Sequence, residues 1–119
     1  MKIITEPEFF ARLKEKLAAL LRAEETFADG DTVYVGRKIK SVMGPGRSGA
    51  IASVYASHYL GAIWLPATMK SPPQSIRPLL LVDTASQSGA SLRKLANRVK
   101  AEYQVALFTE PPRVKFWYE

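Results

Sequence analysis

The segment from Leu79 to Leu92 constrains the fold of this chain more than any other stretch of the sequence. It begins with four consecutive apolar residues, Leu79 to Val82, as in a strand that is buried on both faces. Asp83 follows, and after it come small polar residues with a single glycine. A helix is then predicted from about Ser91, because apolar residues recur there at helical spacing, namely Leu92, Leu95, Ala96 and Val99.

This order of strand, small-residue turn and helix is typical of a phosphate-binding site. Backbone N–H groups at a helix N-terminus point toward the ligand, and the helix dipole favours negative charge there. In open parallel sheets, ligands bind outside the carboxyl ends of the strands. The carboxylate of Asp83 would then lie beside the bound phosphate, where it could bind sugar hydroxyls or a magnesium ion.

A second junction with the same pattern lies earlier in the chain, at 44–49, with the sequence Gly-Pro-Gly-Arg-Ser-Gly. It joins a strand-like segment, 39–43, to a helix predicted over 50–60. Its backbone N–H groups and the guanidinium of Arg47 suit a diphosphate. Glycine-rich turns before helices also occur for structural reasons alone, so that a simple turn is the alternative interpretation of this segment.

The remaining pattern predicts an α/β fold. A helix begins after Thr5, with Glu8 three residues on as in a capping box, and runs to about Glu25. Other segments have the character of strands (32–36, 39–43, 61–67, 104–109 and 114–119) or of a further helix (91–102). A hairpin and a bend are both open for the chain at Arg37 and Lys38. Strands that alternate with helices indicate a mostly parallel sheet flanked by helices in three layers, as a single domain over 1–119.

Composition excludes several classes of site. The chain has no cysteine and only one histidine, His58, so thiolate and histidine-cluster metal sites are excluded. No apolar run approaches the roughly 18 residues of a membrane span, and the N-terminal residues do not form a signal peptide, so we expect a cytoplasmic protein without a membrane partner. The net charge of +6 suits an anionic small ligand or a nucleic acid, although ordinary surface lysines would give the same value.

The two junctions together resemble the sequence motifs of type I phosphoribosyltransferases. The phosphoribosyl-diphosphate (PRPP) motif of that family has an apolar run, two acidic residues, three variable positions and Thr-Gly-small-Thr. Here Asp83 is the first acid, and Thr84 replaces the second. The uracil-specific branch of the family also lacks that second acid. Residues 88–91 read Ser-Gly-Ala-Ser. Residues 42–49 are similar to the pyrophosphate loop of the family, with Arg47 at its arginine. The resemblance covers about Val42 to Pro112.

The resemblance implies a Rossmann-like α/β fold and the transfer of ribose 5-phosphate from PRPP to a nucleobase, with release of pyrophosphate. It implies Mg²⁺ as cofactor, PRPP and a nucleobase or nucleotide as partners, and a possible homodimer. Asp83, Arg47 and Lys70 are the expected catalytic residues, and Asp83 is also the expected metal ligand. The residues expected around the ribose and 5′-phosphate are Asp83, Thr84, Ser86, Gln87, Ser88, Gly89, Ala90 and Ser91. Those expected around the pyrophosphate are Pro45, Gly46, Arg47 and Ser48.

Trp117 and Phe116 are the candidates for stacking on the base, with packing of their rings on the core or on a partner subunit as the alternative. Lys70 and Arg77 lie in a short, proline-rich linker, 68–78, where the family has a long loop that closes over the active site. Both could face the diphosphate or be ordinary surface charges. Gln87 stands at the position where some purine-specific members have an aspartate base. This argues against a guanine- or hypoxanthine-type mechanism in which residue 87 acts as the base.

Two other functions stay open from the sequence. The replacement of the second acid by Thr84 and the short linker favour a non-catalytic module on the same fold, one that senses PRPP or a nucleotide or binds RNA. Another α/β fold with a phosphate loop would share the strand–turn–helix units but not their order along the chain. His58 is expected to be a packed or surface residue.

Overall fold

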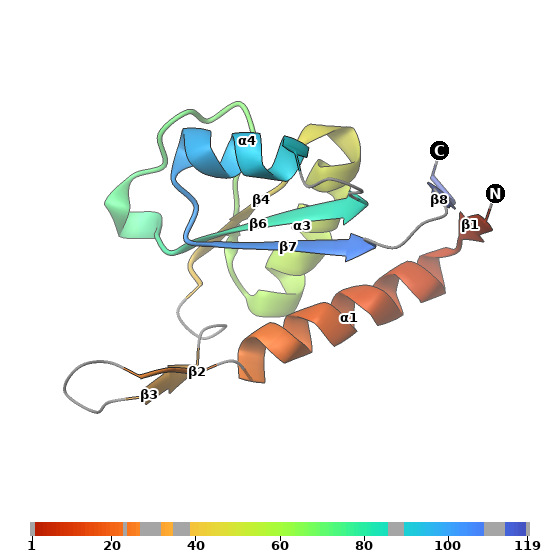
Figure 1. The fold of residues 1–119 in the computed structure, drawn as a ribbon, viewed down its shortest axis with the longest axis horizontal. Coiled ribbons are helices and arrows are strands. Elements are labelled where there is room, and N and C mark those ends of the chain that lie inside the picture. Colours follow the sequence, from red (N-terminus) through yellow and green to blue (C-terminus); the bar gives the residue numbers. More distant parts are fainter. Residues whose placement is uncertain are drawn as a thin grey trace.

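The computed structural model describes residues 2–22, 24–26, 32–34, 39–85, 90–108 and 114–118. Within these ranges a four-stranded parallel sheet has the strand order β5-β4-β6-β7 (Figure 1). Its strands are β4 (Ser41–Met43), β5 (Ile63–Trp64), β6 (Leu79–Ala85) and β7 (Tyr103–Phe108). Strands β4 and β6 form the central pair. After β4 the chain crosses to β5 at one edge of the sheet, and after β6 it crosses to β7 at the other edge.

Three helices cover the two faces of this sheet: α1 (Glu6–Arg22), α3 (Gly46–Leu60) and α4 (Ala90–Val99). Helices α1 and α3 pack on one face and α4 packs on the other, which makes three layers (Figure 1). The predicted class, an α/β fold with a parallel sheet flanked by helices, is therefore confirmed. Within the described ranges no helix has both the length and the apolar character needed to cross a membrane.

The buried apolar run of β6 supplies both halves of the core. Leu80 and Val82 pack with residues of α1 and α3, and Leu79 and Leu81 pack under α4, because side chains alternate between the faces of a strand. The residues of α1 and α3 in the first cluster include Phe9, Leu13, Leu17, Ala52 and Ala56. Those of α4 in the second are Leu92, Leu95 and Val99. All four β6 side chains have no exposed surface.

Two smaller pairs of strands lie outside this sheet. Strand β1 (Lys2–Ile4) is parallel to β8 (Val114–Phe116), and β2 (Glu24–Thr26) is antiparallel to β3 (Thr32–Tyr34). The prediction that the first helix continues to about Glu25 was wrong, because the chain enters β2 at Glu24. Of the two segments that could have formed a hairpin, 32–34 pairs with β2 and 41–43 lies in the parallel sheet, while Arg37 and Lys38 lie outside the described residues.

The pairing of β1 with β8 brings the two ends of the described chain together (Figure 1). The backbone N–H of Trp117 donates to the carbonyl of Ile4 at 3.0 Å. The ring of Phe9 has edge contacts with Trp117, at 5.2 Å between centroids, and with Phe116, at 6.0 Å. At the start of α1 the hydroxyl of Thr5 accepts the N–H of Glu8 at 3.3 Å, as predicted for the helix cap.

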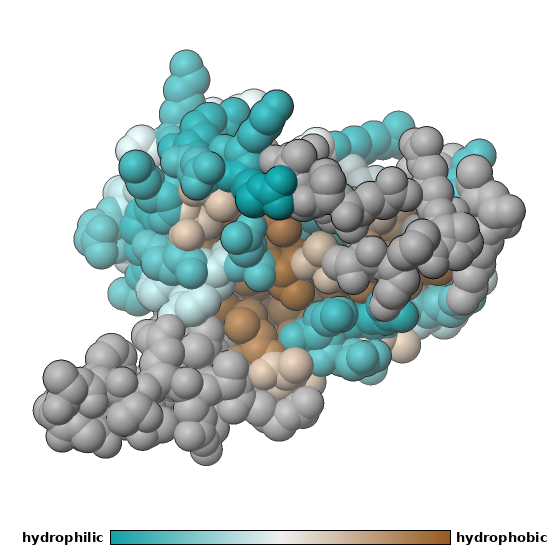
Figure 2. All heavy atoms as spheres, in the orientation of Figure 1, coloured by the Kyte–Doolittle hydropathy of each residue, from teal (hydrophilic) through white to brown (hydrophobic). Residues whose placement is uncertain are grey.

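Strand β7 is one edge of the parallel sheet. Figure 2 shows apolar surface between the hydrophilic side chains of α4 and α1, where Figure 1 places β7. Arg12 of α1 covers one end of this edge: its guanidinium donates to the carbonyl of Leu107 at 3.0 Å and lies 4.7 Å from the centre of the Phe108 ring. A bound cation at this position blocks part of the edge against pairing with another strand.

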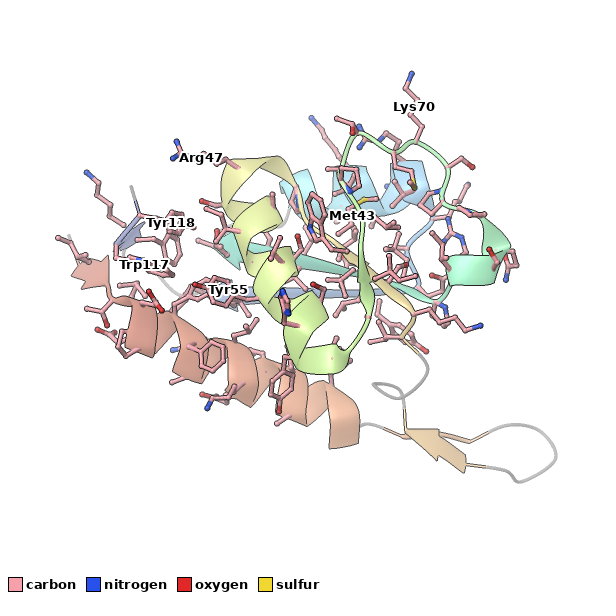
Figure 3. The ribbon with its side chains drawn as sticks, turned by 180° about the vertical axis from the view of Figure 1, so that it is seen from behind. Met43, Arg47, Tyr55, Lys70, Trp117 and Tyr118 are labelled. Carbon is pink, nitrogen blue, oxygen red and sulfur yellow. The ribbon has the colours of Figure 1, made fainter. Side chains whose placement is uncertain are left out.

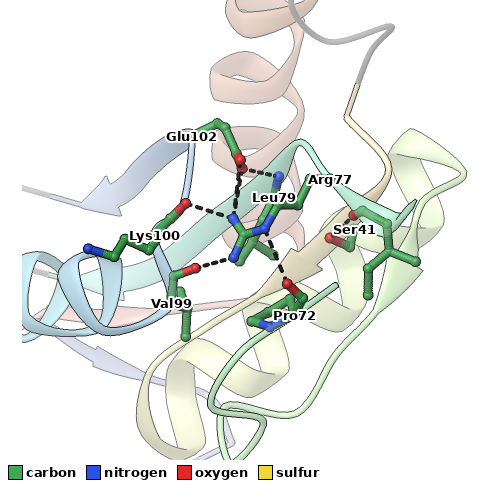
Figure 4. Close-up of polar contacts among 8 residues, drawn as sticks. Ser41, Pro72, Arg77, Leu79, Val99, Lys100 and Glu102 are labelled. Carbon is green, nitrogen blue, oxygen red and sulfur yellow. Dashed lines mark hydrogen bonds and ion pairs between the residues drawn. The ribbon is translucent and has the colours of Figure 1, made fainter. Parts of the chain in front are cut away.

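Arg77 joins the amino end of β6 to the carboxyl end of α4 (Figure 4). Its guanidinium donates to the carbonyls of Val99, Lys100 (2.7 Å) and Pro72 (3.2 Å), and it pairs with Glu102 at 3.1 Å. Glu102 in turn accepts the backbone N–H of Leu79 at 2.7 Å. The last carbonyls of α4, which have no partner within the helix, are thus satisfied by a cation. Arg77 is a structural residue at the end of the sheet opposite the predicted diphosphate site, so the interpretation that it faces the diphosphate was wrong.

We expect Arg77→Met to lower the free energy of unfolding by about 2–4 kcal/mol, because it leaves helix carbonyls and the Glu102 carboxylate without their charged donor. Glu102→Gln is the matched control. Its amide oxygen can still accept the N–H of Leu79, so its effect should be smaller. Urea unfolding of the two variants measures this, and a loss below about 0.5 kcal/mol for Arg77→Met would contradict a structural role.

Candidate functional site

The carboxyl ends of β4 and β6 lie side by side at the centre of the sheet, where the two following helices leave in opposite directions. A pocket of about 370 Å³ opens there and is lined by Pro45, Gly46, Arg47, Ser48 and Asp83. The structure therefore places all four predicted pyrophosphate-loop residues around one pocket with Asp83, the predicted ribose-binding carboxylate. This edge of an open parallel sheet is where ligands of such folds bind.

Helix α3 begins at Gly46, four residues before the predicted start at Ala50. Arg47 and Ser48 therefore lie in its first turn and not in a loop. The N-cap residue is Pro45, whose side chain makes no capping hydrogen bond. Pro45 thus leaves the first-turn N–H groups without a capping acceptor, and the positive end of the helix dipole lies at the pocket.

The backbone before α3 lies directly against β6. A Cβ atom on Gly44 would be 2.0 Å from the carbonyl oxygen of Gly49 and 2.5 Å from that of Val82. Gly46 has φ +64°, a conformation that side chains disfavour. Gly44 therefore allows the helix N-terminus to approach the central strand, and Gly46 allows the backbone to turn into the helix.

Asp83 is the carboxylate of the pocket, and its side chain is 9% exposed. Its Oδ1 atom accepts the backbone N–H of Thr84 at 2.8 Å. Burial raises the pKa of Asp83 above its ordinary value of 3.8, and the hydrogen bond from Thr84 opposes part of this rise. Within the described residues no three potential metal ligands cluster, and Asp83 is the carboxylate that lines the pocket.

Ser48 is held from outside the pocket by the C-terminal aromatic segment. The hydroxyl of Tyr118 donates to Ser48 Oγ at 2.9 Å, and the Tyr118 ring stacks on Phe116 at 5.5 Å between centroids. Figure 3 shows Tyr118 and Trp117 beside the end of α3 that carries Arg47. Because Ser48 Oγ accepts from Tyr118, its own O–H is left to donate toward a ligand in the pocket.

The structure corrects two predicted contacts. Thr84 is 2% exposed and does not line the pocket, since it occupies the strand position after Asp83 and points to the opposite face. Phe116 is 4% exposed and packs in the core against Phe9 and Phe108, so its faces are not available to a base. For Phe116 the alternative, packing on the core, holds. Trp117 is half-buried, and its stacking on a base stays a prediction.

Lys70 does not meet the other predicted catalytic residues in the described structure. It is exposed on the linker between β5 and β6, apart from Arg47 and pointing away from the body of the protein (Figure 3). His58 is exposed in the last turn of α3, which agrees with the surface interpretation. Ser86, Gln87, Ser88 and Gly89 lie outside the described residues. Ala90 and Ser91 form the start of α4.

A second pocket, of about 430 Å³, contains basic residues that were not predicted from the sequence. It shares Pro45 and Gly46 with the first pocket and is otherwise lined by Ala67, Lys94, Leu95 and Arg98. The sequence contains one indication of this pocket. Lys94 and Arg98 are four residues apart in a predicted helix, so they share one face of it, next to the apolar stripe that includes Leu95. This spacing does not indicate which flank faces the site.

Neither a protein-family model nor a curated protein sequence matches this chain. Among solved structures, the xanthine-guanine-hypoxanthine phosphoribosyltransferase of Helicobacter pylori is similar, with a TM-score of 0.64 and 13% sequence identity. The match covers 98% of this chain and 90% of that chain. At this identity the likeness shows the fold alone. The chain thus has an α/β fold, with a parallel sheet flanked by helices, that matches the fold of a type I phosphoribosyltransferase.

We expect Asp83→Asn to stabilise the ligand-free protein at neutral pH. The raised pKa means that the folded state binds this proton more tightly than the unfolded state, so parent stability falls as pH rises from 3.8 through the raised value. Asparagine keeps the oxygen that accepts the Thr84 N–H and removes the buried charge. Urea unfolding at about pH 7 and about pH 3 should show a gain at neutral pH that disappears in acid. A variant less stable than the parent at neutral pH would contradict this electrostatic account.

We expect Tyr118→Phe to weaken anion binding in the first pocket about two- to fivefold, because it removes the hydrogen bond that directs the Ser48 hydroxyl. Calorimetric titration with inorganic pyrophosphate measures the effect in a cycle with Ser48→Ala. Tyr118 acts through Ser48, so its substitution should have no further effect when Ser48 is already alanine. Equal effects of Tyr118→Phe in both backgrounds would contradict this coupling.

Proposed function

We propose that this protein binds PRPP and transfers its ribose 5-phosphate to a nitrogen atom of a nucleobase, with release of pyrophosphate. The observation that carries the proposal is the pocket in which Asp83 faces the first turn of α3, between the central strands of a fold that is also found in a phosphoribosyltransferase. Asp83 suits the ribose hydroxyls of a sugar diphosphate, and Arg47 with the first-turn N–H groups of α3 suits its diphosphate.

The reaction breaks the bond between C1′ and the diphosphate oxygen and forms a bond between C1′ and the nitrogen of the base. The electron pair of the broken bond leaves with the diphosphate, and positive charge develops on the ribose ring. Catalysis then consists mainly of holding the diphosphate and positioning the base, which requires no histidine. Arg47, the first-turn N–H groups of α3 and the hydroxyl of Ser48 are the donors for the diphosphate.

Asp83 is the proposed acceptor for the ribose hydroxyls. Its buried carboxylate accepts one hydrogen bond from the described part of the chain, at Oδ1, so the rest of its lone pairs can accept hydrogen bonds or bind a cation. Mg²⁺ usually binds through one or two carboxylates together with substrate phosphates, and Asp83 beside a bound diphosphate fits that requirement. When bound, the ion would offset the charge of the leaving diphosphate.

The 5′-phosphate is assigned to residues 86–91, which precede and open α4. The start of α4 at Ala90 supports this, because a phosphate at that point would meet a helix N-terminus, as the motif requires. Trp117 is the proposed stacking partner of the base. It lies beside Tyr118, which contacts the pocket residue Ser48.

A second candidate function is a non-catalytic PRPP or nucleotide sensor, or an RNA-binding module, on the same fold. Two observations favour it: Thr84 is buried at the position of the second acid, and the linker between β5 and β6 is bound by side chains at two points, Ala67 and Pro72. Arg98 donates to the carbonyl of Ala67 at 2.5 Å, and Arg77 donates to that of Pro72. Pyrophosphate release from PRPP, measured across a panel of bases, separates the two. A sensor would bind PRPP without releasing pyrophosphate with any base.

We expect Arg47→Ala to lower the affinity for PRPP and pyrophosphate about 10- to 100-fold, and to affect a nucleoside monophosphate much less. The reason is that the guanidinium in the first turn of α3 would contact the diphosphate and not the 5′-phosphate. Lys40→Ala is the control, because Lys40 is exposed at the amino end of β4, away from the pocket. Equal losses for all three ligands would mean that the two phosphate sites are assigned to the wrong loops.

A further inference from the structure

We infer that the second pocket, between Lys94 and Arg98, is an additional anion subsite that takes the distal phosphate of a diphosphate held in the first pocket. This rests on the proposed function. The two pockets share Pro45 and Gly46, so a ligand group at the start of α3 lies on the border of both. A diphosphate needs two adjacent sites of positive charge, and Arg47 lines the first.

The two cations are presented by one face of α4. Lys94 and Arg98 are one helical turn apart, and the buried residue Leu95 lines the same pocket. Arg98 has a hydrogen bond at this pocket, because one of its terminal nitrogens donates to the carbonyl of Ala67, which also lines it. A guanidinium has five N–H donors, so this bond leaves others for a ligand.

Among the residues that the structure describes, no acidic side chain pairs with the cations of this pocket. The sequence of α4 has no acidic residue, and neither does the linker over 66–78. Lys94 and Arg98 form no ion pair with any residue that the structure describes. Glu102 is committed to Arg77 and the N–H of Leu79 at the other end of the sheet. A concave site with uncompensated positive charge favours a multiply charged anion.

A small diphosphate fits these pockets better than RNA does. The two pockets are adjacent hollows, and the second has apolar lining from Ala67 and Leu95. An RNA strand needs a continuous basic groove with stacking surfaces for successive bases. Lys70 and Arg77 of the linker do not line either pocket, so α4 supplies the charge that would otherwise come from a closing loop.

The test compares Lys94→Met with Lys100→Met, which removes the same charge just beyond the far end of α4. Both lysines are exposed, so both variants should fold. Isothermal titration calorimetry at one ionic strength, with magnesium present, measures binding of inorganic pyrophosphate and of ribose 5-phosphate. We expect Lys94→Met to weaken pyrophosphate binding about three- to tenfold and to leave ribose 5-phosphate within about twofold. Lys100→Met should change neither by more than about twofold.

Three results would overturn the subsite: equal effects of the two variants on pyrophosphate, equal losses of both ligands in Lys94→Met, or a larger loss for a single-stranded RNA oligonucleotide than for pyrophosphate. The proposed function is tested separately. If Arg47→Ala loses pyrophosphate and Lys94→Met does not, the subsite is wrong and the proposed function stands. If the parent protein does not bind PRPP, the proposed function itself is wrong.

Discussion

The parallel pairing of β4 with β6 is the constraint on which the rest of this structure depends. Its register, from Ser41 opposite Leu79 to Met43 opposite Leu81, places the end of β4 two residues before Asp83 of β6. The chain leaves this pair toward opposite faces, and a space for a ligand is left between the two exits. Gly44 allows the first exit to lie against the backbone of β6, which brings the start of α3 to Asp83. The candidate site follows from this pairing more than from any single side chain.

The two ends of the sheet differ in how their charges are satisfied. At the amino end of β6, Arg77 and Glu102 neutralise each other and also bind free backbone groups of α4 and Leu79. At the carboxyl end, the buried Asp83 has a raised pKa, and the cations around the pockets have no acidic partner among the described residues. An arrangement that stabilises the fold at one end and leaves charge unpaired at the other is expected of a binding site, because the ligand supplies the missing partners.

The sequence predicted what local pattern determines. The run Leu79–Val82 has no polar position, which is typical of a strand buried on both faces, and the order of the two glycine-containing junctions predicted which strand ends meet. It did not predict the start of α3. A turn and a close contact between a helix and a strand both favour glycine, so the sequence does not distinguish them. The β1–β8 pair joins three-residue strands from opposite ends of the sequence and leaves no local signal. Lys94, Arg98 and Tyr118 belong to the candidate site only through tertiary contacts, and Phe116 was misassigned for the same reason.

The central claim is that one ligand bridges the first turn of α3 and Asp83. A crystal structure of the protein with PRPP and magnesium tests it most directly. The account predicts diphosphate density against Arg47 and the N–H groups that follow Pro45, with the ribose hydroxyls within hydrogen-bond distance, about 2.5–3.0 Å, of Asp83. Ligand density that leaves Asp83 without a contact, or that lies away from the junction of β4 and β6, would contradict it.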